Sequence, residues 1–328
     1  MPKSHNTPVY QAFIKAEPNY SIGYVTRIDG GKKTRIVHAP KHNKHGKVIS
    51  RKSGYKLRSA FHWLMASSTI KKVYQKETKK WFSFKINFIT LTLSSLQVHS
   101  DQFIKQHLLE PFLKWISRKY GSNTYIWKAE VQSNGNIHFH ITTNVFVHWK
   151  AIRLKWNRLQ FNHGYFVNSK FENPIEEANS TDVHSVKNQG TIINYLVKYF
   201  SKSDSRKKTC SLYVDTNQSN MMLHNYDWEM EPDGAWYELK RPVQCKLWSC
   251  SHHLTNASIR IEAGYKAFED YQSFLSNNPD ITKTELERCS LFTYSPTVIN
   301  SMPSDVRLAF KEQIKRIREF SNQQNVTV

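Results

Sequence analysis

Asn136-Ile137-His138-Phe139-His140-Ile141 is the stretch that decides the fold of this 328-residue chain. Its residues alternate between polar and apolar types, which is typical of a half-buried β-strand. Alternate side chains of a strand point to the same face, about 6.5–7 Å apart along the backbone. His138 and His140 therefore share one face, while Phe139 and the two isoleucines share the other. The stretch predicts a strand that packs a core with one face and can chelate a metal ion with the other.

The turn before this strand predicts which residue lies beside the histidines. A three-residue loop, Ser133-Asn134-Gly135, with Gly135 in the left-handed conformation is a common hairpin connection. This loop pairs Gln132 with Asn136, and it places Glu130 opposite His138 on the same face.

A shorter turn made of Asn134 and Gly135 alone would pair Val131 with His138 instead. Because hydrophobic patterning decides strand register, the longer loop is the better prediction. Only the longer loop keeps all the apolar side chains of the two strands together: Ala129, Val131, Ile137, Phe139 and Ile141.

The predicted register assembles Glu130, His138 and His140 into a candidate metal site. Two imidazoles and one carboxylate leave coordination positions open for water and phosphate oxygens, and the set suits Mn²⁺, Mg²⁺ or Zn²⁺. A nearby threonine or Gln132 could orient the ligands from behind. The alternative interpretation is a pair of histidines that is merely exposed on a sheet face.

A second set of polar residues is predicted on a helix over Gln189–Lys202. Its apolar stripe leaves Tyr195, Lys198, Tyr199 and Lys202 together on the opposite face. Attack of a phenol on a phosphodiester yields a phosphotyrosine and a free 3′-hydroxyl, and the bond energy is retained. Lys198 could stabilise phenolate or phosphorane charge, or move a proton. The alternative is an amphipathic helix with solvated tyrosines.

The order of the predicted elements indicates an α+β fold with a ferredoxin-like antiparallel sheet and flanking helices. The central strand pair is predicted to bring Thr90 and Thr92 near the histidines. The predicted strands are Asn87–Ser94, Tyr125–Gln132, Ile137–Asn144 and Asp182–Lys187, and the predicted helices are Asp101–Tyr120, closed by Gly121, His148–Phe161 and Gln189–Lys202.

The charge of the chain indicates a polyanionic partner. The formal net charge is +21, and residues 1–80 hold 18 Lys and Arg against three Asp and Glu, a net of +15. Aromatic residues make up 13% of the chain, and aromatic platforms among basic residues suit single-stranded nucleic acid. Residues 1–50 are predicted to be a partly flexible or irregular DNA-facing arm. An apolar-rich helix around Lys56–Tyr74 is predicted either to contact DNA or to dock on the next domain.

The remainder, residues 206–328, has no motif that assigns it a role. Helices are predicted over Ala257–Ser276 and Ser304–Asn322, after strand-like pieces.

The four cysteines are too scattered for a disulfide scaffold. Neither a signal peptide nor a long apolar run is present, so the sequence predicts a cytoplasmic protein without a membrane partner. A zinc site built from Cys245, Cys250, His252 and His253 is a further alternative.

Three short motifs resemble motifs I, II and III of the HUH endonucleases. They are Phe88-Ile89-Thr90-Leu91-Thr92, His138-Phe139-His140 and Tyr195-x-x-Lys198-Tyr199, within residues 81–205. The chain is most similar to the two-tyrosine rolling-circle replication initiators of single-stranded DNA bacteriophages and related replicons.

The resemblance implies an HUH nickase domain over 81–205, with a basic N-terminal extension and a mixed C-terminal extension. It implies that Tyr195 and Tyr199 alternate as nucleophiles at a single-stranded DNA origin. Mg²⁺ or Mn²⁺ is the implied working metal, and relatives use a glutamate as a ligand at the position of Glu130. No phosphate-binding loop of the Gly-x-x-x-x-Gly-Lys-Ser/Thr type is present, so unwinding is expected to need a separate host helicase, and synthesis a host DNA polymerase.

Two other classes remain open on the sequence. A related HUH transposase usually has one tyrosine in a smaller chain, and a relaxase usually carries three histidines and an N-terminal tyrosine. A non-catalytic nucleic-acid-binding protein on the same sheet would instead present aromatic side chains on the open face.

Overall fold

A computed structural model describes residues 10–27, 49, 51–75, 79–121, 124–166, 170–186, 227–230, 236–239, 241–255, 257–286 and 289–322. The chain divides into two compact units. The first comprises 1–41, 58–68 and 252–323, and the second comprises 42–57, 69–251 and 324–328. Each unit contains an antiparallel sheet with helices, so the predicted α+β class is confirmed.

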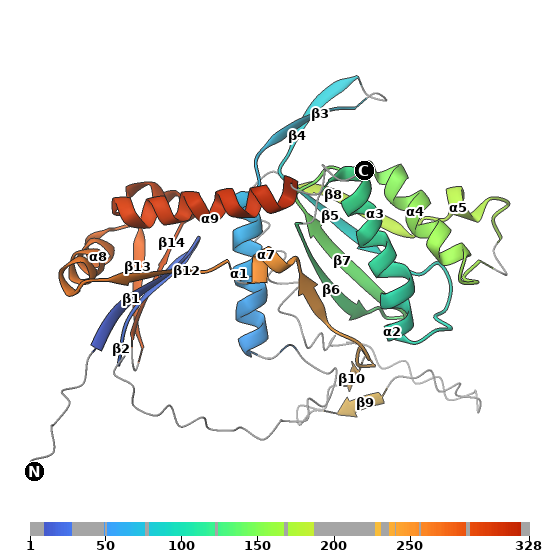
Figure 1. Cartoon of the computed structure of the whole chain (residues 1–328). Helices are drawn as coiled ribbons and strands as arrows, with labels where there is room; N and C mark the ends of the chain where they lie inside the picture. The colour runs from blue at the N-terminus through green and yellow to red at the C-terminus, as the bar shows by residue number, and fades with distance from the viewer. Residues whose placement is uncertain are drawn as a thin grey trace, which may run out of the picture. The chain divides into compact units, whose positions relative to one another are not determined.

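The second unit contains a five-stranded antiparallel sheet in the order β11-β6-β7-β5-β8 (Figure 1). Leaving out β11, this is the order predicted for a ferredoxin-like sheet, with the first and third strands as central neighbours. The strands are β5 (Ile86–Leu91), β6 (Tyr125–Val131), β7 (Ile137–Thr143), β8 (Thr181–Val186) and β11 (Trp248–Cys250).

Helices cover one face of this sheet. A nearly continuous helical segment consists of α2 (Asp101–Ile104), a π-helical turn (Lys105–Leu109) and α3 (Glu110–Tyr120). It ends at Gly121, whose φ of 66° is the left-handed conformation expected of a C-cap glycine. The second covering helix is α4 (Trp149–Phe161), followed by the short α5 (Pro174–Glu177).

The core lies between the helices and the apolar side of the hairpin. Phe139 and Trp156 are fully buried there, and burial of such a side chain stabilises the fold by roughly 2 kcal/mol. The apolar residues predicted to share one face all belong to this core: Ala129, Val131, Ile137, Phe139 and Ile141. The opposite face is left for polar side chains.

The strand β11 brings a distant segment into this sheet. Trp248 pairs with Lys128, and Cys250 with Ile126. The two compact units therefore differ from the ranges 1–80, 81–205 and 206–328 expected from the sequence. That those three ranges act as separate functional regions stays a prediction. A second small pairing joins β9 (Asp227–Met230) and β10 (Trp236–Leu239).

The predicted helix over Lys56–Tyr74 is only partly correct. The helix α1 spans Arg51–Ser67, and a strand, β3 (Lys71–Gln75), follows and pairs with β4 (Lys80–Phe84). The Ser68 hydroxyl donates to the Leu64 carbonyl and closes the helix end. Within the first unit, Trp63 of this helix is fully buried and stacks on Phe310. Contact with DNA and docking on the next domain both stay predictions.

The first unit is built on a five-stranded antiparallel sheet in the order β12-β1-β2-β14-β13. The prediction of an irregular arm is wrong for residues 10–27, which form a hairpin of two strands. The hairpin pairs on its two sides with strands far along the chain. The predicted helix Ala257–Ser276 is wrong in its first part, since Ile259–Ala263 is a strand. The elements are β1 (Tyr10–Glu17), β2 (Tyr20–Arg27), α7 (His252–Thr255), β12 (Ile259–Ala263), α8 (Tyr265–Asn277), β13 (Ile281–Leu286), β14 (Cys289–Tyr294), a 3₁₀ turn (Pro296–Ser301) and α9 (Ser304–Asn322).

In the described parts of the chain, no helix has both the length and the apolar character needed to cross a bilayer.

Candidate metal centre

The hairpin β6–β7 has the register that the turn predicts. Gly135 has a φ of 82°, and its N–H donates to the Gln132 carbonyl at 3.1 Å. The Gln132 N–H donates to the Asn136 carbonyl at 2.8 Å, and Glu130 lies directly opposite His138. The choice of the longer loop is therefore confirmed.

This register brings Glu130, His138 and His140 together. The Nε2 atoms of His138 and His140 lie 2.7 Å and 2.9 Å from the same oxygen, Glu130 Oε1. The two imidazole rings are 4.5 Å apart between centroids and steeply inclined to each other. The histidines are mostly buried, while the Glu130 side chain keeps 29% of its surface exposed. The cluster is thus enclosed on the protein side and reachable by a ligand through the carboxylate.

The charge state of Glu130 suits a cation. Burial by itself would raise the pKa of its carboxyl, but hydrogen bonds from His138 and His140, together with their charge, hold the pKa well below its usual range. The carboxylate is therefore ionised at neutral pH and has a negative charge to offer.

Two neighbours support His140 from the central strand β5. Thr90 lies opposite His140, and its Oγ1 is 3.1 Å from His140 Nδ1. When Nε2 binds a cation, Nδ1 carries the proton and donates to the threonine oxygen, which fixes the ring orientation. Phe88 stacks on the same imidazole at 5.4 Å with an interplanar angle of 14°. The sequence predicted the threonine contact but not the role of Phe88, although strand parity places both on this face.

Lys128 is a member of the site that the sequence did not predict. It lies opposite His140, is 3% exposed, and its Nζ is 3.5 Å from Glu130 Oε2. Burial lowers the pKa of Lys128, while the charge and hydrogen bond of Glu130 oppose that shift. Residues two positions apart in a strand lie on the same face, so the spacing of Lys128 from Glu130 could have predicted its place in the site. The Lys128 amine thus lies beside Oε2 of Glu130, whereas both histidines lie beside Oε1.

The donor set fits a divalent metal ion. One ligand atom from each of the three residues lies within 4.8 Å of the others, and no other group of three or more His, Cys, Asp or Glu in the described residues meets that condition. The zinc alternative with Cys245, Cys250, His252 and His253 thus has no counterpart in the described part of the chain. Imidazole and carboxylate together are compatible with Mn²⁺, Mg²⁺ or Zn²⁺ and do not single out one of them.

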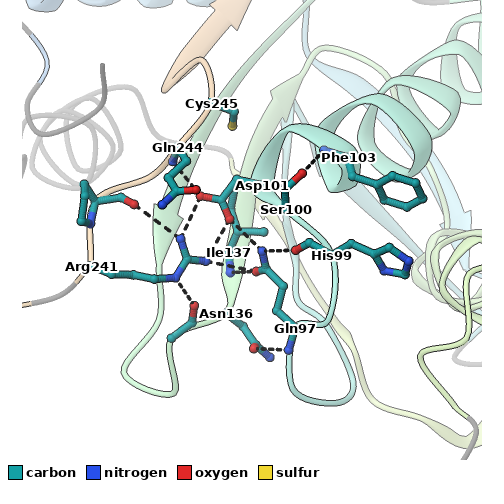
Figure 2. A network of polar contacts seen from close by, with 12 residues as sticks. Gln97, His99, Ser100, Asp101, Phe103, Asn136, Ile137, Arg241, Gln244 and Cys245 are labelled. Carbon is teal, nitrogen blue, oxygen red and sulfur yellow. Dashed lines mark hydrogen bonds and ion pairs between the residues drawn. The ribbon is translucent and has the colours of Figure 1, made fainter. Parts of the chain in front are cut away.

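An ion pair between the buried Asp101 and the partly exposed Arg241 holds the turn of this hairpin (Figure 2). Arg241 donates to both carboxylate oxygens of Asp101 at 2.9 Å, and its Nε donates to the Gly135 carbonyl at 2.7 Å. The Gln244 N–H donates to Asp101 at 2.7 Å. Gln97 joins the same network and donates to Asp101 at 2.8 Å. The segment after residue 240 is thereby attached to the start of α2 and to the turn that sets the register of the metal centre.

The predicted nucleophiles Tyr195 and Tyr199, and the predicted helper Lys198, lie outside the described residues. So does the whole predicted helix Gln189–Lys202. Their roles stay predictions.

A comparison with protein families identifies the class of this domain. Residues 86–204 match the family model described as Replication-associated protein ORF2/G2P. Searches of the curated proteins and of the solved structures return no match. The match covers less than half of the chain and begins at the first residue of β5, where the sheet of the metal centre begins. This segment is similar to a replication-associated family of the rolling-circle initiator type, and the match supports a Rep-like protein.

The contact between Thr90 and His140 leads to a first prediction. Replacing Thr90 with valine keeps the shape of the side chain but removes the hydroxyl, so affinity for Mn²⁺ is expected to fall about 10- to 100-fold. Calorimetric titration of Mn²⁺ into the metal-free protein measures this. Thr92→Val is the matched control, because the Thr92 hydroxyl donates to the Ser180 carbonyl and not to a histidine. Equal affinity in Thr90→Val and wild type would mean that Thr90 does not orient the site.

Proposed function

We propose that this protein initiates rolling-circle replication as a metal-dependent, site-specific endonuclease and strand transferase acting on single-stranded DNA. The observation that carries the proposal is the cluster of Glu130, His138 and His140, which lies on one sheet face inside the segment that matches the replication protein family. The three tyrosine-motif residues Tyr195, Lys198 and Tyr199 belong to the same matched segment.

In this proposal Glu130, His138 and His140 hold a Mg²⁺ or Mn²⁺ ion. Such an ion would supply Lewis-acid polarisation of the scissile phosphate and neutralise charge that develops on it. Glu130 contributes the negative charge of the site, and Thr90 and Phe88 hold the His140 ring in place. Lys128 Nζ, 3.5 Å from Glu130 Oε2, restrains the rotation of the Glu130 carboxylate.

The covalent step uses a tyrosine. The phenol oxygen of Tyr195 or Tyr199, having lost its proton, attacks the phosphorus, and the bond from phosphorus to the 3′ oxygen breaks. The 3′ oxygen takes up a proton and leaves as a hydroxyl, while the 5′ end stays bound as a phosphotyrosine. Lys198 stabilises the charge on the phenolate or carries the proton. Attack by a 3′-hydroxyl on the phosphotyrosine reverses these steps and rejoins a strand.

Two tyrosines allow two rounds of this chemistry without release of the DNA. One residue cleaves the origin, and the other cleaves the regenerated origin after one round of synthesis. Host helicase and polymerase are the proposed partners, and the host cytoplasm is the proposed location.

The test is a search for the covalent intermediate. The protein is incubated with labelled single-stranded origin DNA and Mn²⁺ or Mg²⁺, and a shifted band that resists denaturation is expected. EDTA should prevent it, and Tyr195→Phe/Tyr199→Phe should abolish it while each single variant keeps part of it. An adduct that survives the double substitution would show that the nucleophile lies elsewhere. DNA binding with no adduct under any of these metals would favour a non-catalytic binding protein.

A further inference from the structure

The ribbon formed by β3 and β4 stands apart from the five-stranded sheet of its unit (Figure 1). It pairs with no other strand among the described residues, and its own register places Tyr74 opposite Trp81 and Val73 opposite Phe82. A two-stranded ribbon on its own is at best marginally stable in water. Its two faces differ in what they contact.

One face of the ribbon is anchored. Phe82 and Phe84 both pack against Phe146, with ring centroids 5.4 Å and 5.3 Å away. At the same end of the ribbon, the Lys71 ammonium donates to the Asn144 carbonyl at 3.2 Å, just beyond β7. These contacts fix the ribbon to the unit that contains the metal centre.

The other face presents two aromatic rings to solvent. Trp81 is 68% exposed and Tyr74 is 45% exposed. Their rings lie 5.3 Å apart and are tilted by 54°. By strand parity Lys72 is on this face too, and it is exposed. A cross-strand aromatic pair stabilises a ribbon by only about 0.2–1 kcal/mol, which gives little structural reason to leave a tryptophan this exposed.

The charge of the ribbon is strongly positive. Residues 71–80 contain five lysines and one glutamate, a net of +4. The described lysines of the ribbon are all exposed: Lys71, Lys72, Lys79 and Lys80. An exposed aromatic pair among lysines has the two features that bind single strands, namely stacking surfaces for bases and cations for phosphates.

We infer that the outward face of this ribbon is a second binding surface for single-stranded DNA, in which bases stack on Trp81 and Tyr74 while Lys72 contacts a phosphate. The inference deepens the proposed function, because it says where the same DNA is held away from the metal centre. Single-stranded DNA is the expected ligand, since the base faces of a duplex are already stacked on each other and are not available to Trp81.

The test measures binding without chemistry. Affinity for a labelled single-stranded oligonucleotide is determined in EDTA by fluorescence anisotropy. Trp81→Leu and Tyr74→Ala are each expected to weaken binding by roughly 5- to 100-fold, the range for loss of one stacked base. Trp81→Phe keeps an aromatic face and should retain most of the affinity. Lys72→Gln should weaken binding and lower the dependence on salt concentration by about one ion.

Matched controls lie on α8 of the other unit. Tyr265 is 56% exposed, and Lys266 next to it is exposed as well. Acidic residues follow on the same helix, so Tyr265→Ala and Lys266→Gln are expected to leave binding unchanged. Circular dichroism checks that the ribbon variants remain folded.

The inference is overturned if Trp81→Leu binds single strands as tightly as wild type, if Trp81→Phe loses as much affinity as Trp81→Leu, or if duplex DNA of the same sequence shows an equal loss. Concentration-dependent self-association that disappears in Trp81→Leu, with DNA affinity unchanged, would also overturn it and identify a second copy of the chain as the occupant. Because no metal is present, these results are independent of cleavage. If the ribbon variants weaken DNA binding but the wild-type protein forms no covalent adduct, this inference holds and the proposed chemistry is wrong.

Discussion

Replacing both His138 and His140 with alanine is expected to reduce covalent adduct formation by about 1,000-fold or more, while affinity for single-stranded DNA changes little. The two imidazoles provide two of the three ligand atoms within 4.8 Å, and Glu130 alone would bind a divalent cation weakly. Several kcal/mol of transition-state stabilisation by a metal ion corresponds to a rate factor of this size. Adduct yield at saturating DNA, measured over a series of Mn²⁺ concentrations, gives the effect.

The controls separate chemistry from folding. His252→Ala removes an exposed imidazole from α7 in the other unit and should leave the adduct yield unchanged. Glu130→Gln keeps the shape of the third ligand but removes its charge, so excess Mn²⁺ is expected to restore part of its activity. Full adduct formation by the double histidine variant would show that the metal assignment is wrong.

Replacing Arg241 with alanine is expected to lower the free energy of unfolding by about 3 kcal/mol or more. Asp101 is 1% exposed, and Arg241 is its ion-pair partner. Removing one partner of a buried pair leaves an uncompensated charge, which costs about 3–5 kcal/mol. The variant also loses the bond to the Gly135 carbonyl, so loosening of the hairpin turn and weaker Mn²⁺ binding are expected as well. Urea unfolding and metal titration measure the two effects.

The pH dependence of this effect follows from the pKa of Asp101. Burial raises that pKa, but hydrogen bonds from Arg241, Gln244 and Gln97 and the charge of Arg241 together lower it below the usual value. A carboxyl with a depressed pKa stabilises the fold above the unfolded pKa of about 4 and loses that contribution as the pH falls through the folded pKa. The difference between wild type and Arg241→Ala should therefore be largest near neutral pH and shrink in acid.

A surface ion pair provides the comparison. Lys283 contacts Glu285 at 2.5 Å, but both side chains are largely exposed. Lys283→Ala should not change stability measurably, because solvent screens such pairs. If Arg241→Ala were as harmless as Lys283→Ala, the network in Figure 2 would not be what holds the turn.

The sequence alone was enough to predict that Glu130, His138 and His140 cluster, because all the evidence for the cluster is local. Hydrophobic alternation assigns Phe139 to the core face, and the length of the loop ending at Gly135 determines which residue meets His138. Both follow from the period of a strand and the conformation of one glycine. Parity in β5 likewise placed Thr90 beside His140, as the structure has it.

Other features required partners far apart in the chain. No local pattern pairs Trp248 with Lys128, or Arg241 with Asp101, because these contacts join segments separated by more than 100 residues. Residues 10–27 form a local hairpin, but the sheet that contains it is completed by strands near the other end of the chain, which no local pattern reveals.

The sequence by itself thus determined four strands of the sheet, its two faces and the clustering of Glu130, His138 and His140, since each depends on spacing within one hairpin or one strand pair. Only the tertiary structure decided what surrounds them: the buried Lys128, the stacked Phe88, the Arg241 ion pair and the outward face of the β3–β4 ribbon. Strand parity places Lys128 and Phe88 on the face of the histidines, but how deeply each is buried and what it contacts depend on packing and long-range pairing, which arise only when the chain folds.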